Sequence, residues 1–202
     1  MITLIVTGGI ATGKSTFCSL FRARWPEAAF FDSDGAVHEL LTTRIIIDNI
    51  VSEFGKRVLE KNGQLNRSII REIVFAGQSE RRALESILHP EVRRICLERR
   101  EAAEASARCP VFLADVPLFF ESDFPLTHDY SIVVATSSET QKRRLMTRSP
   151  MAADLAERII GAQWPIGDKV RRADIVAWNE GELGSLGSQI QYLKEWLQTK
   201  KL

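Results

Sequence analysis

Short apolar runs alternate with longer segments of helical periodicity along most of this chain. Five runs are apolar almost throughout, which is typical of parallel strands covered on both faces: residues 2–6, 28–31, 111–114, 130–135 and 175–178. Helices are predicted between and after them at 14–24, from Ser138 onward, and at about 185–200. Strands separated by helices imply right-handed crossovers, so the pattern predicts a doubly wound α/β sheet.

Two of these helices carry more detailed signals. The sequence Ser-Glu-Thr-Gln at 138–141 is a capping-box pattern, which predicts that a helix opens at Ser138. The last helix places four apolar residues on one stripe: Leu186, Ile190, Leu193 and Leu197. Such a stripe predicts a helix that packs one side against a core.

The stretch from about 37 to 108 breaks the alternation of strands and helices. It contains three or four helical patterns and no convincing strand. The pair His89-Pro90 is expected to interrupt one of these helices, because proline clashes with the preceding turn. We interpret this stretch as a helical lobe that is inserted between the second and third strands and holds a second substrate.

Composition narrows the possible classes. The chain has 202 residues, enough for one domain with an inserted lobe, and its 27 basic and 26 acidic side chains leave a net charge of +1. This balance argues against nucleic-acid binding, so an anion must be held by a local site. Three cysteines without close spacing indicate a reducing compartment, and neither a signal peptide nor a membrane-length apolar run is expected. We therefore expect a cytoplasmic protein.

The segment Gly8–Ser15 matches the pattern G-x-x-x-x-G-K-[ST] at every fixed position. Glycines allow a tight turn whose amide groups face phosphate oxygens, and the following helix adds its positive dipole end. Lys14 is expected to reach the β- and γ-phosphates, and the Ser15 hydroxyl to hold Mg²⁺. The residues expected to bind the nucleoside triphosphate are Gly9, Ile10, Ala11, Thr12, Gly13, Lys14, Ser15 and Thr16.

Carboxylates follow two of the predicted strands. Asp32 and Asp34 close the second strand, and either could face the γ-phosphate as a proton acceptor, because ligands bind at the carboxyl ends of strands in such sheets. The alternative is that Asp34 caps a helix beginning at Gly35. Asp115 closes the third strand, where it could orient Mg²⁺ through water or serve only as a turn residue before proline.

Arginines follow the fourth strand. Arg144 and Arg148 are four residues apart and therefore share one helix face. After a phosphate loop, we expect both to fold over the phosphoryl group, stabilise its charge and exclude water. For Arg171 and Arg172 a solvated helix face remains the favoured interpretation.

The set of motifs resembles the dephospho-coenzyme A kinase family from about residue 5 to 197. The resemblance depends on the order of the segments that carry it: Thr7–Thr16, Asp32–Asp34 with His38, Leu65–Arg67, Leu88–Pro90, Asp115–Glu121, Gln141 with Arg144 and Arg148, Arg158 with Gln163 and Lys169, and Asn179–Gly181. Departures such as Ala11-Thr12, Phe119-Phe120 and the turn Ser149-Pro150-Met151 affect the details of lid closure and lobe packing.

The resemblance implies a three-layer P-loop kinase fold with a five-stranded parallel sheet. Its core would comprise about 1–36, 109–145 and 173–202, its helical substrate lobe about 37–108 and its lid about 146–172. It also implies ATP with Mg²⁺ as donor and dephospho-coenzyme A as small-molecule acceptor, in a monomer or weak homo-oligomer.

The resemblance also implies roles for individual residues. Asp34 would be the catalytic base, with Asp32 assisting it, and Asn179 would lie near adenine. The acceptor would be held by residues at and beyond the second strand: Asp32, His38, Arg67, Phe75 and His89. For His89, bonding to backbone groups before Pro90 is an equally good interpretation.

Two alternatives remain. Another small-molecule or nucleotide kinase would share the phosphate loop, and only the helical-lobe motifs argue against it. A nucleotide-dependent switch is disfavoured, since the sequence has no N-K-x-D signature.

Overall fold

The computed structural model describes residues 1–106, 108–122 and 124–200, and the side chains of residues 75 and 76 lie outside this description. The chain divides into two compact units, one formed by Met1–Phe31 with Arg100–Leu202 and the other by Asp32–Arg99. No helix in the described part of the chain is long and apolar enough to cross a membrane.

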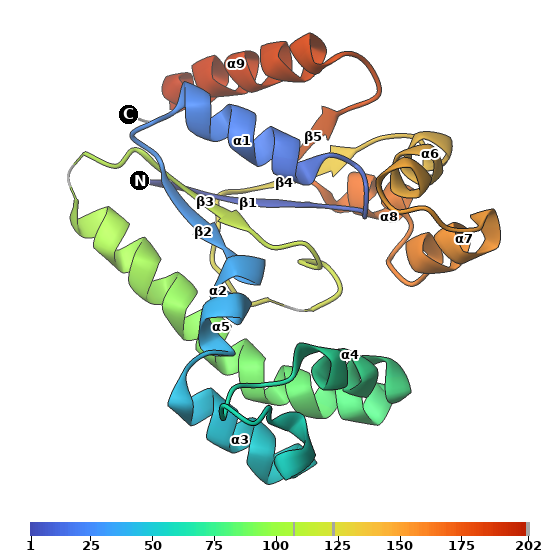
Figure 1. Ribbon diagram of the computed structural model, residues 1–202. Helices are drawn as coiled ribbons and strands as arrows, with labels where there is room; N and C mark the ends of the chain where they lie inside the picture. Colours follow the sequence, from blue (N-terminus) through green and yellow to red (C-terminus); the bar gives the residue numbers. More distant parts are fainter. Residues whose placement is uncertain (107, 123, 201–202) are drawn as a thin grey trace. The chain divides into compact units, whose positions relative to one another are not determined.

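All five predicted strands form one sheet (Figure 1). They are β1 (Ile2–Gly8), β2 (Ala29–Asp32), β3 (Val111–Asp115), β4 (Tyr130–Ala135) and β5 (Ile175–Trp178), in the order β2-β3-β1-β4-β5. β1 pairs in parallel with β3 and β4, and β4 pairs in parallel with β5. The predicted parallel α/β sheet is confirmed, with β1 between β3 and β4.

Helices occupy the intervals between β1 and β2, between β2 and β3 and between β4 and β5, and a further helix follows β5. In chain order they are α1 (Lys14–Arg24), α2 (Ser33–Leu40), α3 (Arg44–Phe54), the 3-10 turn η1 (Lys56–Val58), α4 (Arg67–Ala76), α5 (Gln78–Ala105), α6 (Ser138–Arg148), α7 (Ala153–Gly161), α8 (Ile166–Arg172) and α9 (Leu183–Lys200). α1 matches its predicted bounds, and α9 begins two residues before its predicted start.

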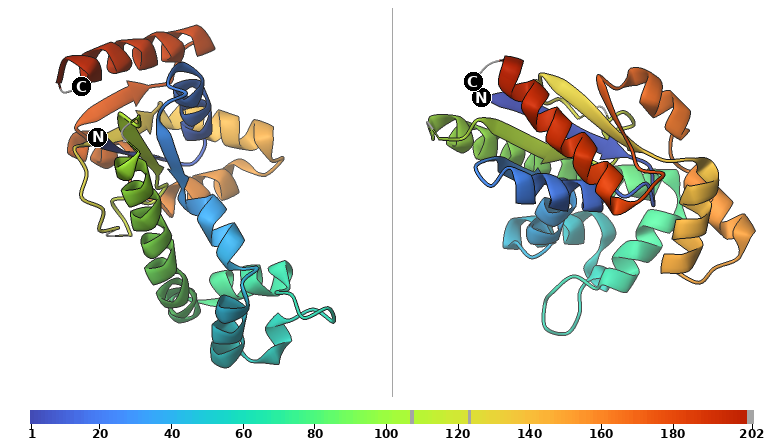
Figure 2. Two further views of the ribbon diagram at one scale, coloured as in Figure 1. Left: turned by 90° about the vertical axis from the view of Figure 1, so that its left-hand side faces the viewer. Right: turned by 90° about the horizontal axis from the view of Figure 1, so that it is seen from above.

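Helices α1 and α9 lie side by side over one face of the sheet, as Figures 1 and 2 show from three directions. Phe17 and Phe21 of α1 meet the predicted α9 stripe in a single buried cluster with Leu4 and Val134 of the sheet. Side chains that point to the opposite face, such as Ile5, are buried as well. Both faces of the central strands are therefore covered, which explains their almost wholly apolar sequences.

α6 begins at the predicted residue, Ser138, but its capping residue lies one position earlier than the capping-box pattern implied. Ser137 is the capping residue, and its Oγ accepts a hydrogen bond from the Thr140 N–H at 3.2 Å. Ser138 is the first helical residue instead of the cap. A serine pair offers two candidate caps, and the accepted bond three residues ahead selects the first serine.

α5 continues through Pro90, so the predicted interruption at His89-Pro90 is wrong. Proline inside a helix removes one backbone hydrogen bond and crowds the preceding turn, at a cost of about 3 kcal/mol. Buried apolar side chains lie on both sides of the proline: Leu84, Leu88, Val92 and Cys96. Because full burial of one large apolar side chain contributes roughly 1.5–3 kcal/mol, their packing outweighs the local defect.

The second unit has its own apolar core. Ile46 and Ile50 of α3 are buried, as are Val58 of η1 and Ile73 of α4. Asn66 caps α4 by accepting hydrogen bonds from the Ser68 and Ile69 amides. These local signals explain why an all-helical segment follows β2.

Candidate active site

The phosphate loop is a tight turn between β1 and α1. Ala11 and Gly13 adopt positive φ angles of 60° and 92°. The Thr12 hydroxyl donates to the Gly9 carbonyl at 2.8 Å, and the Thr12 amide donates to the same oxygen at 3.3 Å. These bonds close the loop on itself, and the left-handed Gly13 turns the chain into α1.

Side chains outside the loop hold several of its carbonyl groups. Lys169 Nζ donates to the Gly8 oxygen at 3.3 Å, Gln141 Nε2 to the Ile10 oxygen at 2.8 Å, and Asn179 Nδ2 to the Thr12 oxygen at 2.8 Å. In a planar trans peptide the C=O and the next N–H point in opposite directions. The amides of residues 9, 11 and 13 therefore point away from these three side chains, as an anion cradle requires.

The first turn of α1 continues the cradle. The Phe17 amide donates a helical hydrogen bond to the Gly13 oxygen at 3.0 Å. The amides of Lys14, Ser15 and Thr16 precede this bond and form the positive end of the helix dipole. Ser15 is exposed there, so its hydroxyl is accessible to a ligand.

Lys14 forms an ion pair with Asp115 at the end of β3. Both side chains are 17% exposed. The second oxygen of Asp115 accepts a long hydrogen bond from Cys18 Sγ at 3.5 Å. Burial, aided by the negative charge of Asp115, raises the pKa of the Cys18 thiol to about 12. Asp115 thus lies directly beside the lysine of the phosphate loop.

The two arginines of α6 differ in position. Arg144 is half-buried, and its Nη1 lies 3.5 Å from the Thr12 oxygen, at the limit of a hydrogen bond. Arg148 is exposed at the end of the helix. The structure brings Arg144 to the loop and leaves Arg148 one turn further along α6.

Glu180 joins the end of β5 to the start of α6. Its carboxylate accepts hydrogen bonds from the Ser137 amide and from the hydroxyls of Thr136, Ser137 and Thr140. These donors, the Ser137 amide first, lower the pKa of Glu180 to about 2. The network fixes the start of the helix that carries Gln141 and Arg144.

Sequence reasoning placed Gln163, Lys169 and Glu121 in family motifs without giving any of them a task, and it did not single out Glu180. Gln163 Oε1 accepts from the Ile10 amide at 2.8 Å, so two glutamines hold both polar groups of Ile10. Lys169 is fully buried and pairs with Glu121 at 2.6 Å. One signal was available for Lys169: it is three residues after Ile166 and next to Val170, which places it on the apolar side of α8.

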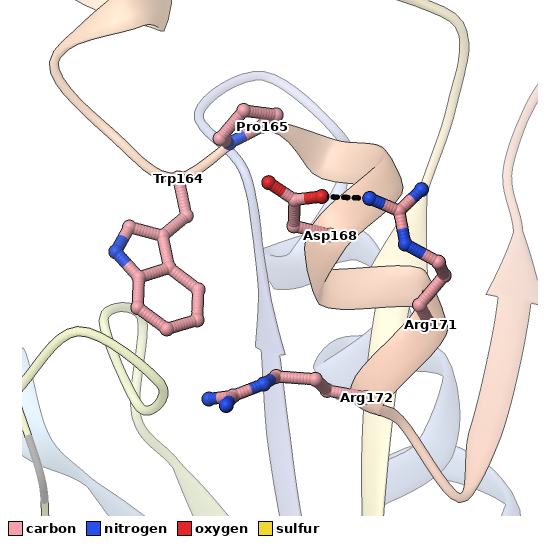
Figure 3. A pocket seen from close by; sticks show the side chains of 5 residues that line it. All are labelled: Trp164, Pro165, Asp168, Arg171 and Arg172. Atoms are coloured by element: carbon pink, nitrogen blue, oxygen red, sulfur yellow. Dashed lines mark hydrogen bonds and ion pairs between the residues drawn. The ribbon is translucent and has the colours of Figure 1, made fainter.

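The C-terminal end of α8 is exposed and is drawn in Figure 3. It borders an open pocket of about 410 Å³, where Arg171 pairs with Asp168 and the Arg172 guanidinium lies 5.0 Å from the Trp164 ring centre. The predicted solvated face for Arg171 and Arg172 is confirmed.

The remaining candidates belong to the second unit. Asp32, not Asp34, caps α2, because its Oδ1 accepts from the amides of Asp34 at 3.0 Å and Gly35 at 3.1 Å. The helix begins at Ser33 instead of Gly35, and Asp34 lies in its first turn. The proposed cap at Asp34 is therefore wrong.

The other acceptor candidates lie on three helices of this unit. His38 is in the last turn of α2, Arg67 is the first residue of α4, and His89 lies within α5. All three are exposed, as are Asp32 and Asp34. Phe75 lies on α4, and its side chain is outside the described residues.

The described residues contain no group of three or more His, Cys, Asp or Glu side chains that could hold a metal.

Gly13→Ala tests the geometry of the loop. A Cβ at Gly13 would lie 2.1 Å from Asn179 Nδ2, on a residue with a φ of 92°. We expect the variant to lose triphosphate binding by at least about tenfold, because Asn179 must move and release the Thr12 carbonyl. Calorimetric titration with ATP measures this. Gly184→Ala is the control, since a Cβ added there would meet no atom within 4 Å, and equal affinities in the two variants would contradict the prediction.

Glu180 predicts an acid-dependent loss of stability. A carboxylate whose folded pKa is about 2, against an ordinary 4.5, contributes stability that is fully present above about pH 4.5 and is lost as the pH falls toward 2. Glu180→Gln removes this contribution. We expect its urea midpoint to lie below that of the unsubstituted protein at pH 7 and the difference to narrow below pH 4.5. Glu182→Gln, an exposed carboxylate two residues further on, is the control. A difference in urea midpoint that stays constant with pH would contradict the lowered pKa of Glu180.

Known proteins resemble this chain over nearly its full length. The family model described as dephospho-CoA kinase matches residues 2–185. The dephospho-CoA kinase of Symbiobacterium thermophilum is 40% identical over 187 residues, which cover 92% of this chain and 77% of that protein. The solved structure of dephospho-CoA kinase from Campylobacter jejuni has a TM-score of 0.71 at 26% identity and 98% coverage of both chains.

A shikimate kinase from Acinetobacter baumannii, solved in complex with shikimate, has a TM-score of 0.54 at 16% identity, with 100% of this chain and 96% of that chain covered. This likeness shows the shared P-loop kinase fold alone. The match to residues 2–185 includes the phosphate loop and every side chain that holds it. The chain belongs to the dephospho-CoA kinase family.

Proposed function

We propose that this protein transfers the γ-phosphoryl group of ATP to the ribose 3′-hydroxyl of dephospho-coenzyme A, giving coenzyme A and ADP. This is the final step of coenzyme A synthesis. The observation that carries the proposal is the phosphate loop whose carbonyl groups are turned outward by fixed side chains, in a chain of this family.

The donor binds along the loop and the start of α1. The amides of residues 9, 11 and 13 and of Lys14, Ser15 and Thr16 surround the phosphates, and Asn179 holds the Thr12 carbonyl on the side where adenine is expected. Lys14 is paired with Asp115, so on binding it exchanges one anionic partner for another and its own charge stays paired.

Magnesium fits the donor set of this site. Its preferred ligands are oxygens, and it is bound through few protein groups together with substrate phosphates. Ser15 Oγ would hold it directly, and Asp115 would act through a water once Lys14 has moved to the phosphates. Bound there, the cation neutralises charge on the phosphate oxygens.

Asp34 takes the proton of the attacking hydroxyl. It is an exposed carboxylate in the first turn of α2, and the Asp32 cap holds its backbone amide. The 3′-oxygen bonds to the γ-phosphorus, the bond from that phosphorus to the β,γ-bridging oxygen breaks, and ADP leaves. Arg144 and Arg148 stabilise the charge on the transferred group when the lid at about 146–172 closes.

The helical segment at about 37–108 binds the acceptor. His38, Arg67, Phe75 and His89 supply cationic, aromatic and hydrogen-bonding groups, the classes that a nucleotide with phosphates requires. We place the enzyme in the cytoplasm, the reducing compartment that its cysteine spacing favours, acting as a monomer or weak homo-oligomer without nucleic acid or membrane.

A second candidate is a kinase for another small acceptor. The shared fold of a shikimate kinase supports it, because one architecture accommodates different acceptors. A coupled ADP-release assay with dephospho-coenzyme A, adenosine and nucleoside monophosphates separates the two. We expect turnover with dephospho-coenzyme A to exceed the others by at least about 100-fold. Comparable turnover with a nucleoside monophosphate would support the second candidate.

Asp34→Asn tests the catalytic base. The substitution keeps the shape of the side chain and removes its proton acceptor, so we expect kcat to fall by roughly 10²–10⁴-fold while the Kd for ATP stays within about twofold. Steady-state kinetics and calorimetry measure the two. Asp48→Asn, an exposed carboxylate paired with Arg44 in α3, is the matched control. Near-normal kcat in Asp34→Asn would remove the base assignment.

A further inference from the structure

We propose that Lys169 is a positioning residue for the phosphate loop. Through its bond to the Gly8 carbonyl it fixes the Gly8–Gly9 peptide, and so directs the Gly9 amide toward the triphosphate. The inference rests on the proposed function only in that the loop binds the phosphates of ATP.

Lys169 is held in one place by its surroundings. Its side chain is 0% exposed, and its ammonium group contacts Glu121 Oε1 at 2.6 Å and the Gly8 oxygen at 3.3 Å. A buried ammonium is strongly disfavoured unless it is paired and hydrogen-bonded. The two partners therefore determine where the nitrogen lies, and the nitrogen determines the direction of the Gly8 carbonyl.

The Gly8–Gly9 peptide needs an external anchor. Glycine on both sides allows the peptide to rotate at little cost, so the local sequence does not fix its direction. Stiffer residues do not fit: a Cβ at Gly8 would lie 2.6 Å from the Val134 oxygen, and one at Gly9 would lie 2.6 Å from Gln141 Nε2. The bonds from Thr12 hold the next carbonyl, that of Gly9, whereas the direction of the Gly8–Gly9 peptide depends on a contact from outside the loop.

Holding the carbonyl also fixes the amide. The chain has no cis peptide among the described residues, so the Gly9 N–H points opposite to the Gly8 C=O. With the carbonyl bonded to Lys169, this N–H points to the side of the loop away from α8. A phosphate oxygen there receives one hydrogen bond that would be absent if the peptide turned.

Glu121 indicates that the pair serves more than stability. Its Oε1 also accepts from the Trp164 amide at 3.2 Å, while its buried Oε2 has no hydrogen-bond partner among the described residues. Buried polar atoms are nearly always satisfied in structures, and apolar replacement of a buried ion pair is often neutral or stabilising. A buried pair with an unsatisfied oxygen points to a function of the ammonium group beyond stability.

The test compares Lys169→Met with the double variant Lys169→Met/Glu121→Leu. The single variant leaves Glu121 buried without its cation, so we expect it to lose both stability and ATP affinity. The double variant removes both charges, so its urea midpoint should return toward that of the unsubstituted protein. Its Kd for ATP and its Ki for inorganic tripolyphosphate should stay raised by about tenfold, the loss expected for one hydrogen bond to a charged group.

Three further readouts make the test decisive. Arg171→Met changes an exposed cation on the same helix and should bind ATP normally. The KM for dephospho-coenzyme A in the double variant should change by less than about twofold, because the acceptor is held elsewhere. In the unsubstituted protein, tripolyphosphate should slow hydrogen exchange of the Gly9 amide, a measurement that does not depend on the folding of any variant.

The inference is overturned if the double variant binds ATP and tripolyphosphate within about twofold of the unsubstituted protein, or if tripolyphosphate leaves the Gly9 amide unprotected. The tripolyphosphate measurements involve no acceptor. An absence of turnover with dephospho-coenzyme A would therefore count against the proposed function. The tripolyphosphate measurements would still test the role of Lys169.

Discussion

Anion binding by backbone amides imposes one constraint on this protein: the carbonyl groups of the same peptides must face the other way. Three bonds meet this constraint in the loop after β1, and they are donated by the side chains of Gln141, Lys169 and Asn179. Each of these peptides would otherwise be free to turn an oxygen toward the phosphates, which repel it. The cradle therefore depends on side chains that touch no phosphate themselves.

The order of the strands explains how two of these distant side chains, Gln141 and Asn179, reach the same loop. β4 neighbours β1, and β5 neighbours β4, so the segments that follow these two strands begin at the same edge as the phosphate loop. Gln141 comes from α6 after β4, and Asn179 follows β5 directly. Glu180 then joins the two segments, which makes the anchors of the loop parts of one network.

The sequence predicts the strands, the loop and the family well, because each depends on a local pattern. Apolar runs mark strands buried on both faces, and the spacing of Gly8, Gly13 and Lys14 marks the loop. It predicts less well what depends on distant partners. Lys169 and Glu121 lie far apart in the sequence, and no periodicity links them. The continuity of α5 through Pro90 likewise depends on buried neighbours that the proline rule ignores.

The thiol of Cys18 lies beside the ion pair of Lys14 and Asp115. This position has a consequence for its redox chemistry. With a pKa of about 12, only about one molecule in 10⁵ carries the reactive thiolate at neutral pH. Peroxide and alkylating agents act on the ionised form, so they would react very slowly at this position. Burial, aided by the carboxylate that neutralises Lys14, keeps this thiol protonated, so the sulfur beside the ion pair resists oxidation.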